Sequence, residues 1–165
     1  VLKFHRFIFA RVKRKLNWRR KMQINEFCWD DVGSVFGILS SEKNGAWTYE
    51  QLEHSLRLEN VLCYVAKNDD KVLGFVLIEE TPYDFDILEI VVDQELRGRG
   101  IGTMLMKRVL GYAKFTHKEK ATLEVASDNK SAIMFYEKFG FSQIGMRKNY
   151  YKNGNDALVF QKTFI

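Results

Sequence analysis

The hexapeptide Arg97-Gly98-Arg99-Gly100-Ile101-Gly102 separates a segment rich in Ile and Val, residues 85–92, from a segment with helical periodicity. Its three glycines allow the backbone to approach a bound group closely and to point several N–H groups in one direction. The N-terminus of the following helix adds partial positive charge, and the two arginines add formal charge. These features together predict a pyrophosphate-binding loop. The alternative interpretation is a solvated strand-to-helix turn.

The spacing of the hexapeptide argues against two other phosphate-binding motifs. A dinucleotide-binding fold has G-x-G-x-x-G spacing and opens with a strand-helix-strand unit, and neither feature is present. A Walker-type loop ends in Gly-Lys-Ser or Gly-Lys-Thr, which is also missing from this stretch.

Hydrophobic periodicity around the hexapeptide predicts an α/β fold. Strands are predicted at residues 23–28, 61–67, 72–79, 85–92, 121–126, 141–150 and 157–164. Helices are predicted at residues 32–39, 101–113 and 129–139, and a further helix is predicted after Thr48, through Leu52, Leu56 and Leu58. The order of the elements favours one mixed sheet with helices on both faces.

Local signals set the ends of these elements. Asp30 or Asp31 is expected to cap the first helix, and Asn44-Gly45 to end it. Thr48 and Gln51 have the spacing of a capping box for the second helix. Three further signals are a hairpin turn at residues 68–71, a bulge at Gly74 and a final turn at Asn153-Gly154-Asn155.

The composition fits one globular domain. The chain has 165 residues, of which 46% are hydrophobic and 28% charged, so it can bury a sizeable core. No apolar run approaches the ~20 residues of a membrane-spanning helix, and we expect no membrane partner. The two cysteines, Cys28 and Cys63, indicate neither a disulfide framework nor a metal site. We expect two reduced thiols, no metal and a cytoplasmic protein.

Basic residues are concentrated at the start of the chain. Residues 1–21 hold nine of the 26 Lys and Arg and no acid, which leaves 17 basic and 21 acidic residues in positions 22–165. We therefore divide the chain into a basic extension, 1–21, and a domain, 22–165. We rank three explanations of the extension: a start-site artefact before a native start at Met22, an arm that binds RNA or a ribosomal surface, and a targeting peptide. Direct nucleic-acid binding is expected only through this extension.

The spacing Arg97-x-x-Gly100-x-Gly102 and the element order resemble the GNAT superfamily of acetyltransferases. Residues 22–164 resemble, more specifically, the bacterial ribosomal-protein N-terminal alanine acetyltransferases of the RimI type. The matching stretches are Ile90-Val91-Val92-Asp93, Leu123-Glu124-Val125, Phe135-Tyr136-Glu137-Lys138-Phe139-Gly140-Phe141 and Arg147-Lys148-Asn149-Tyr150-Tyr151. The resemblance implies a GNAT fold, acetyl-CoA as co-substrate and direct acetyl transfer to the α-amino group of a protein, a ribosomal one first among the candidates.

The resemblance also implies two binding regions. Two parallel strands are expected to separate beside the cofactor, which frees main-chain groups of the first strand for pantetheine. The residues implied for acetyl-CoA are Ile90, Val91, Val92, Arg97, Gly98, Arg99, Gly100, Ile101, Gly102, Thr103 and Asn129. Trp47, Tyr150 and Tyr151 are implied to flank the acceptor peptide. The two tyrosines are interpreted equally well as ordinary strand aromatics.

Acetyl transfer needs a neutral amine and a proton for the departing thiolate. A peptide α-amino group has a pKa of about 7.7–8.0, so a modest base suffices. Glu124 lies in an apolar strand, where the pattern alone favours an acid that faces solvent. The resemblance instead implies that Glu124 is the base. Glu89 is a second candidate, and it departs from the subfamily, in which a polar uncharged residue is common at this position.

Tyr136 is the candidate acid. Asn129, Ala132 and Tyr136 share one helix face, which would bring the phenol near the sulfur while Asn129 holds pantetheine amides. A phenol is a suitable proton donor to a thiolate. The alternative is an aromatic residue packed in a cluster with Phe135 and Phe139. The resemblance favours the functional interpretation.

Two other functions stay open at this point. One is a GNAT enzyme that acetylates a small amine. The other is a CoA-binding or ribosome-associated module without catalysis, which the basic extension supports. The presence of both Glu124 and Tyr136 argues against a module without catalysis.

Overall fold

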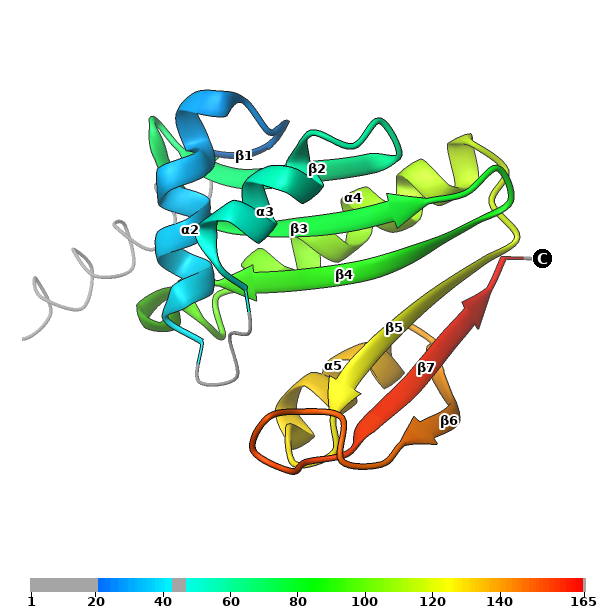
Figure 1. Cartoon of the computed structure of the whole chain (residues 1–165). Helices are drawn as coiled ribbons and strands as arrows, with labels where there is room; N and C mark the ends of the chain where they lie inside the picture. Colours follow the sequence, from blue (N-terminus) through cyan, green and yellow to red (C-terminus); the bar gives the residue numbers. More distant parts are fainter. Residues whose placement is uncertain (1–20, 43–46, 165) are drawn as a thin grey trace, which may run out of the picture.

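A computed structural model describes residues 21–42 and 47–164 (Figure 1). The predictions for the basic extension up to residue 20 and for Asn44-Gly45 lie outside this part of the chain. The domain boundary after residue 21 therefore stays a prediction.

The described residues form one seven-stranded sheet in the order β1-β2-β3-β4-β5-β7-β6. All neighbouring strands are antiparallel except β4 and β5, which are parallel. The strands are β1 Met22–Glu26, β2 Val61–Asn68, β3 Lys71–Glu80, β4 Asp84–Val92, β5 Lys120–Ala126, β6 Ser142–Arg147 and β7 Ala157–Thr163. The mixed sheet that the sequence predicts is confirmed.

Helices cover both faces of the sheet (Figure 1). They are α2 Val32–Ser40, α3 Tyr49–Leu56, α4 Ile101–Phe115 and α5 Lys130–Lys138, with short 3-10 turns η1 Trp29–Asp31 and η2 Gln94–Leu96. The predicted stripe of α4 is buried in one core, together with Phe85 of β4 and Tyr136 of α5. Val35 of α2 and Leu52 of α3 pack with Phe75 in a second core on the opposite face.

A β-bulge interrupts β4 at Leu88. Glu89 pairs with Leu77 of β3, and Ile87 pairs with the adjacent Ile78, so Leu88 is an extra residue. One extra residue reverses the alternation of side chains along a strand. Ile87, before the bulge, therefore packs in the core beneath α4, whereas Val91, after it, packs in the core beneath α2 and α3.

The same region of β4 leaves its parallel neighbour. β4 pairs with β5 only over Asp84–Ile87 and Lys120–Leu123, and the two strands separate beyond these residues (Figure 1). β5 continues to pair with β7 as far as Ala126. The strand separation implied by the resemblance is present.

Several predicted ends are confirmed and several are wrong. The Thr48–Gln51 capping box forms, with N–H···O distances of 3.2 and 2.8 Å. Asp31 stands at the N-cap of α2 without a side-chain cap, because its carboxylate pairs with Lys67 at 2.6 Å. The bulge predicted at Gly74 falls on the preceding residue, Leu73, which has no partner on β2.

Three elements end at least two residues before their predicted ends, and the first of them is β1, which ends at Glu26 instead of Cys28. Helix α3 ends at Leu56, so Leu58 lies beyond it and is 39% exposed. Strand β6 ends at Arg147, because Asn149 turns away with a φ of 52° and donates its N–H to Asp156. Tyr150 and Tyr151 consequently lie in the connection to β7.

The packing of α4 gives a test of the fold. Leu105 is fully buried beneath the sheet, and Leu105→Ala should lower the free energy of unfolding by about 2–5 kcal/mol through lost burial and a residual cavity. Lys107→Ala on the exposed side of the same helix is the matched control and should change it by less than about 0.5 kcal/mol. Urea denaturation measures both values, and equal effects would contradict this packing.

Candidate active site

The glycine hexapeptide forms a turn from β4 into α4, as predicted. Gly98 and Gly100 have φ values of 72° and 89°, a conformation that other residues rarely adopt. Gly100 is the N-cap of α4 and offers no side chain to the first turn. The first backbone N–H groups of the 15-residue helix, from Ile101 onward, have no intrahelical acceptor and lie at the positive end of its dipole. The turn is therefore suited to an anion.

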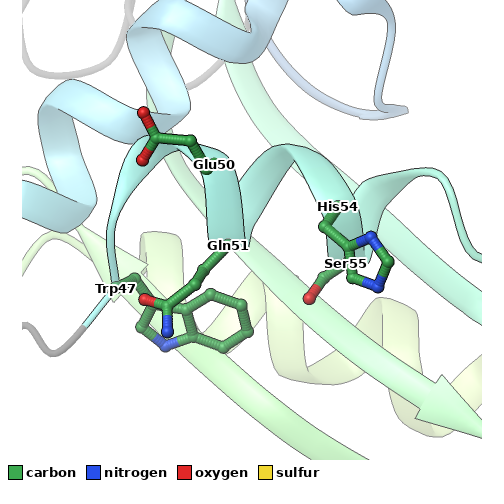
Figure 2. Close-up of a pocket in the computed structure, with 5 residues that line it drawn as sticks. All are labelled: Trp47, Glu50, Gln51, His54 and Ser55. Carbon is green, nitrogen blue, oxygen red and sulfur yellow. The ribbon is translucent and has the colours of Figure 1, made fainter.

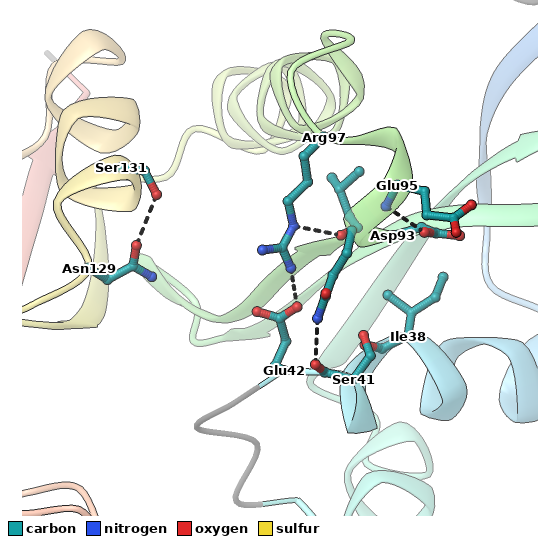
Figure 3. A network of polar contacts seen from close by, with 10 residues as sticks. Ile38, Ser41, Glu42, Asp93, Glu95, Arg97, Asn129 and Ser131 are labelled. Carbon is teal, nitrogen blue, oxygen red and sulfur yellow. Dashed lines mark hydrogen bonds and ion pairs between the residues drawn. The ribbon is translucent and has the colours of Figure 1, made fainter.

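Arg97 ties this turn to the end of α2. Its Nε donates to the carbonyl of Val92 at 3.1 Å, and its guanidinium forms an ion pair with Glu42 (Figure 3). Gln94 adds a second tie through a 2.6 Å hydrogen bond to the carbonyl of Ser41. These contacts give Arg97 a structural role, because they hold the turn against the end of α2. Its part in phosphate binding stays a prediction. Arg99 donates to the carbonyl of Glu95 at 3.2 Å.

The separation of β4 and β5 exposes a strand edge beside the turn. Within the described residues, the edge of β4 toward β5 has no strand partner beyond Ile87. Ile90, Val91 and Val92, the residues implied to hold pantetheine, lie in this part of β4. The carbonyl of Val92 accepts a hydrogen bond from Arg97, and the carbonyl of Val91 lies against Gly74 of β3. An extended amide chain can hydrogen-bond to such an edge as an added strand would.

Glu124, the predicted base, lies on β5 next to this separation. Its carboxylate accepts a 3.0 Å hydrogen bond from Nε of Arg147 in an ion pair. Tyr150 also hydrogen-bonds to Glu124, and this contact is the largest cause of the raised pKa of the tyrosine. The guanidinium of Arg147 lies 5.6 Å from the centre of the Tyr150 ring. Glu124 is thus engaged by two side chains.

Tyr136, the predicted acid, is 8% exposed on α5. Its ring packs edge-on against Phe135 and Phe141, at centroid distances of 5.5 and 6.2 Å. Burial raises the pKa of its phenol well above the usual range, and the charge of Glu89 raises it further. The phenol is therefore protonated at neutral pH, as a proton donor must be.

Asn129 caps α5. Its Oδ1 accepts hydrogen bonds from the backbone N–H of Ala132 at 3.2 Å and from the hydroxyl of Ser131 at 3.1 Å (Figure 3). These contacts account for the residue in the fold, because an Asn at this position satisfies an otherwise unpaired donor. A contact with pantetheine stays a prediction.

Glu89 is half-buried on β4, on the far side of the bulge from Ile87. Its Oε1 accepts a 3.0 Å hydrogen bond from the indole Nε1 of Trp47. Burial raises the pKa of the Glu89 carboxyl to about 7, while the bond from Trp47 opposes this rise and the charge of Glu42 adds to it. Glu89 is thus poised to exchange a proton near neutral pH.

Tyr151 lies within the electrostatic influence of both candidate bases, Glu124 and Glu89. Burial raises its pKa to about 12, and the charges of Glu124 and Glu89 contribute to the rise. Trp47, Tyr150 and Tyr151, the three residues implied to flank the acceptor, therefore all neighbour one of the two carboxylates. The structure brings the predicted acceptor residues and both candidate bases into one region.

From the sequence, Glu89 is the second candidate for the base, after Glu124. The spacing of the apolar residues around it nevertheless indicates how its side chain is oriented. Phe85 and Ile87 are two positions apart, as are Ile90 and Val92, but Ile87 and Ile90 are three positions apart. A break of this kind in the two-residue alternation indicates a bulge. A bulge next to a site redirects the side chain that follows it, which here is that of Glu89.

A separate cavity of about 440 Å³ lies along α3 and is lined by Trp47, Glu50, Gln51, His54 and Ser55 (Figure 2). It shares only Trp47 with the region around Glu89. His54 is an exposed residue.

Within the described residues, no group of three or more His, Cys, Asp or Glu side chains is arranged to hold a metal ion. None of the described helices is long and apolar enough to cross a membrane.

Residues 23–141 match the family model described as "Acetyltransferase (GNAT) family". The chain belongs to this family and is an acetyltransferase of the GNAT fold. It is 31% identical over 148 residues to a Bacillus subtilis protein provisionally named ribosomal protein bS18-alanine N-acetyltransferase, and the match covers 88% of this chain and 97% of that protein.

Two further comparisons agree with this match. A Salmonella typhimurium ribosomal protein bS18-alanine N-acetyltransferase is 28% identical over 76% of this chain and 95% of its own length. The crystal structure of Ard1 from Thermoplasma volcanium has a TM-score of 0.82 and 28% identity, over 88% of this chain and 99% of that one.

The glycine turn gives a test of the cofactor site. Gly100→Glu should abolish measurable acetyl-CoA binding, because a side chain strains the left-handed backbone and its charge repels the pyrophosphate. Gly111→Glu is the matched control, since Gly111 is exposed on α4 and a Cβ there would meet no atom within 4 Å. Isothermal titration calorimetry compares the two. Wild-type affinity in a folded Gly100→Glu protein would refute the assignment.

Proposed function

We propose that this enzyme transfers acetyl from acetyl-CoA to the N-terminal α-amino group of a protein, with a ribosomal protein as the first candidate. The observation that carries the proposal is the separation of β4 and β5 beside the glycine turn, next to two carboxylates and three tyrosines. The names of the relatives that match over nearly their full length support the same acceptor.

The chain offers acetyl-CoA two kinds of backbone contact. The N–H groups at residues 98–103 would hold the pyrophosphate, since Gly98 and Gly100 turn the backbone and α4 begins there. The edge of β4 that has left β5 would bind the pantetheine amides in the stretch Ile90, Val91 and Val92, through the main-chain groups that Arg97 and β3 do not engage. Acetyl-CoA supplies the activated acetyl group, and the residues of the chain supply orientation and proton transfer.

Two proton movements are assigned to side chains. A carboxylate next to the separated strands accepts the proton that the amine loses, and Glu124 is the one that the resemblance implies. Tyr136 donates a proton to the sulfur that leaves, since its burial keeps it protonated until that step. The Arg147 ion pair keeps Glu124 close to Tyr150 on the acceptor side.

The charge of the domain favours a basic acceptor. Residues 22–165 contain 17 basic and 21 acidic residues, a net charge of −4. Such a field attracts a basic N-terminal peptide, and the attraction weakens as salt screens it.

An acceptor panel tests the proposed substrate. A basic peptide with a free N-terminal Ala should be acetylated faster than the same peptide with a blocked N-terminus and an internal Lys, or than a polyamine. Its kcat/KM should fall as salt increases. Transfer of radiolabelled acetyl measures the rates, and a preference for the polyamine would overturn the proposal.

Tyr136→Phe tests the acid. The variant retains the ring that packs against Phe135 and Phe141 and loses only the hydroxyl, so acetyl-CoA affinity should stay unchanged while kcat falls about 100-fold. Tyr83→Phe is the control, because Tyr83 is 66% exposed and lies outside the proposed site. Unchanged turnover in Tyr136→Phe would remove this residue from the mechanism.

A further inference from the structure

Glu89 and Trp47 form a pair that joins two distant parts of the chain. Trp47 lies just before Thr48, the N-cap of α3, and its indole Nε1 donates a 3.0 Å hydrogen bond to Glu89 Oε1 across 42 positions of sequence. The bulge at Leu88 places Glu89 after the point where β4 changes face. Glu89 also lies two residues beyond Ile87, the last residue of β4 that pairs with β5.

We propose that Glu89 is the carboxylate that accepts the amine proton, and that Trp47 is a positioning residue that orients this carboxylate through its indole hydrogen bond. This inference rests on the proposed acetyl transfer to an amine and specifies the base for it. Glu124 then has a different role, because its ion pair with Arg147 holds the acceptor side of the site.

The two acids differ in what engages them. The side chain of Glu124 is 25% exposed and is already engaged by the guanidinium of Arg147. Glu89 has a neutral donor, Trp47, and no described cation is paired with it. A carboxyl with a pKa of about 7 accepts a proton from an α-ammonium of pKa about 7.7–8.0 at little cost.

The groups that face Glu89 come from four elements. Trp47 approaches from the segment before α3 and Glu42 from the end of α2, where Arg97 pairs with Glu42. Tyr136 of α5 and Tyr151 after β6 lie close enough for Glu89 to raise their pKa values. With Glu89 charged, both phenols stay protonated, so the base form of Glu89 and the acid form of Tyr136 coexist.

The step balances without a further reactant. The α-ammonium loses one proton to the Glu89 carboxylate, and the amine nitrogen forms the new N–C bond as the C–S bond breaks. Tyr136 gives its proton to the sulfur. The second amine proton is lost to solvent, and the phenol regains one proton from solvent. Glu89 returns its proton to solvent before the next turnover.

The substitution Glu89→Gln separates catalysis from structure. Gln retains an oxygen that can accept the indole hydrogen bond, so a purely structural role would survive the change. We expect kcat/KM for the preferred amine to fall about 100-fold, with unchanged acetyl-CoA affinity. Glu50→Gln is the matched control and should behave as wild type, because Glu50 is an exposed acid that lines the same cavity as Trp47 and has no part in the mechanism (Figure 2).

Trp47→Phe tests the positioning role through pH. The indole bond stabilises the charged carboxylate, so its removal should raise the pKa of Glu89 further. The base form would then appear only at higher pH, and the acidic limb of kcat/KM should move to higher pH, with a loss of up to about tenfold at pH 7. The pKa of the substrate amine is unaffected, so a shifted limb reports Glu89. A profile that falls equally at every pH would indicate a structural role alone.

A direct titration decides the proposal independently of activity. The ¹H–¹⁵N resonance of the Trp47 indole should titrate with a midpoint near pH 7 in the wild type and in Glu124→Gln, and should be flat in Glu89→Gln. A flat wild-type profile, or wild-type kcat/KM in Glu89→Gln, would overturn the role of Glu89. Failure of the peptide acceptor alone would overturn the proposed substrate, since the titration needs no acceptor.

Discussion

Leu88 has no partner on β3, and the geometry of the site depends on this single extra residue. Up to Ile87, β4 is an ordinary interior strand that pairs on both edges. Beyond Leu88, its side chains change face and its pairing with β5 has ended. The bulge thus accompanies both features that the site needs: a free backbone edge for an amide-rich ligand and a carboxylate, Glu89, turned toward Trp47.

The surroundings hold this strand in place from both sides. Gly74 of β3 lies so close that a Cβ there would be 2.7 Å from the carbonyl of Val91, which leaves room only for glycine. At the end of β4, Arg97 joins the carbonyl of Val92 to Glu42 after α2. A rigid scaffold of this kind keeps the backbone donors fixed before a ligand arrives, which lowers the cost of binding. Belonging to the GNAT family is consistent with this architecture.

The sequence predicted the sheet and the anion turn because their signals are local. The α4 stripe, the Thr48–Gln51 capping box and the glycine turn each depend on residues a few positions apart. Other features depend on distant contacts. Lys67 draws Asp31 away from its expected role as a helix cap, and the Trp47 bond to Glu89 spans 42 positions. No periodicity encodes such pairs, so the sequence named Glu89 a candidate without showing what tunes its proton affinity.

In the proposed function, the free edge of β4 and the turn into α4 bind acetyl-CoA through main-chain groups. Residue-resolved amide hydrogen exchange, with and without acetyl-CoA, measures this directly. We expect slower exchange at the edge of β4 beyond Ile87 and at residues 98–103, with no change along β6. Protection confined to other parts of the chain, such as the cavity along α3, together with unchanged exchange in β4 and the turn, would contradict main-chain binding of acetyl-CoA at this edge.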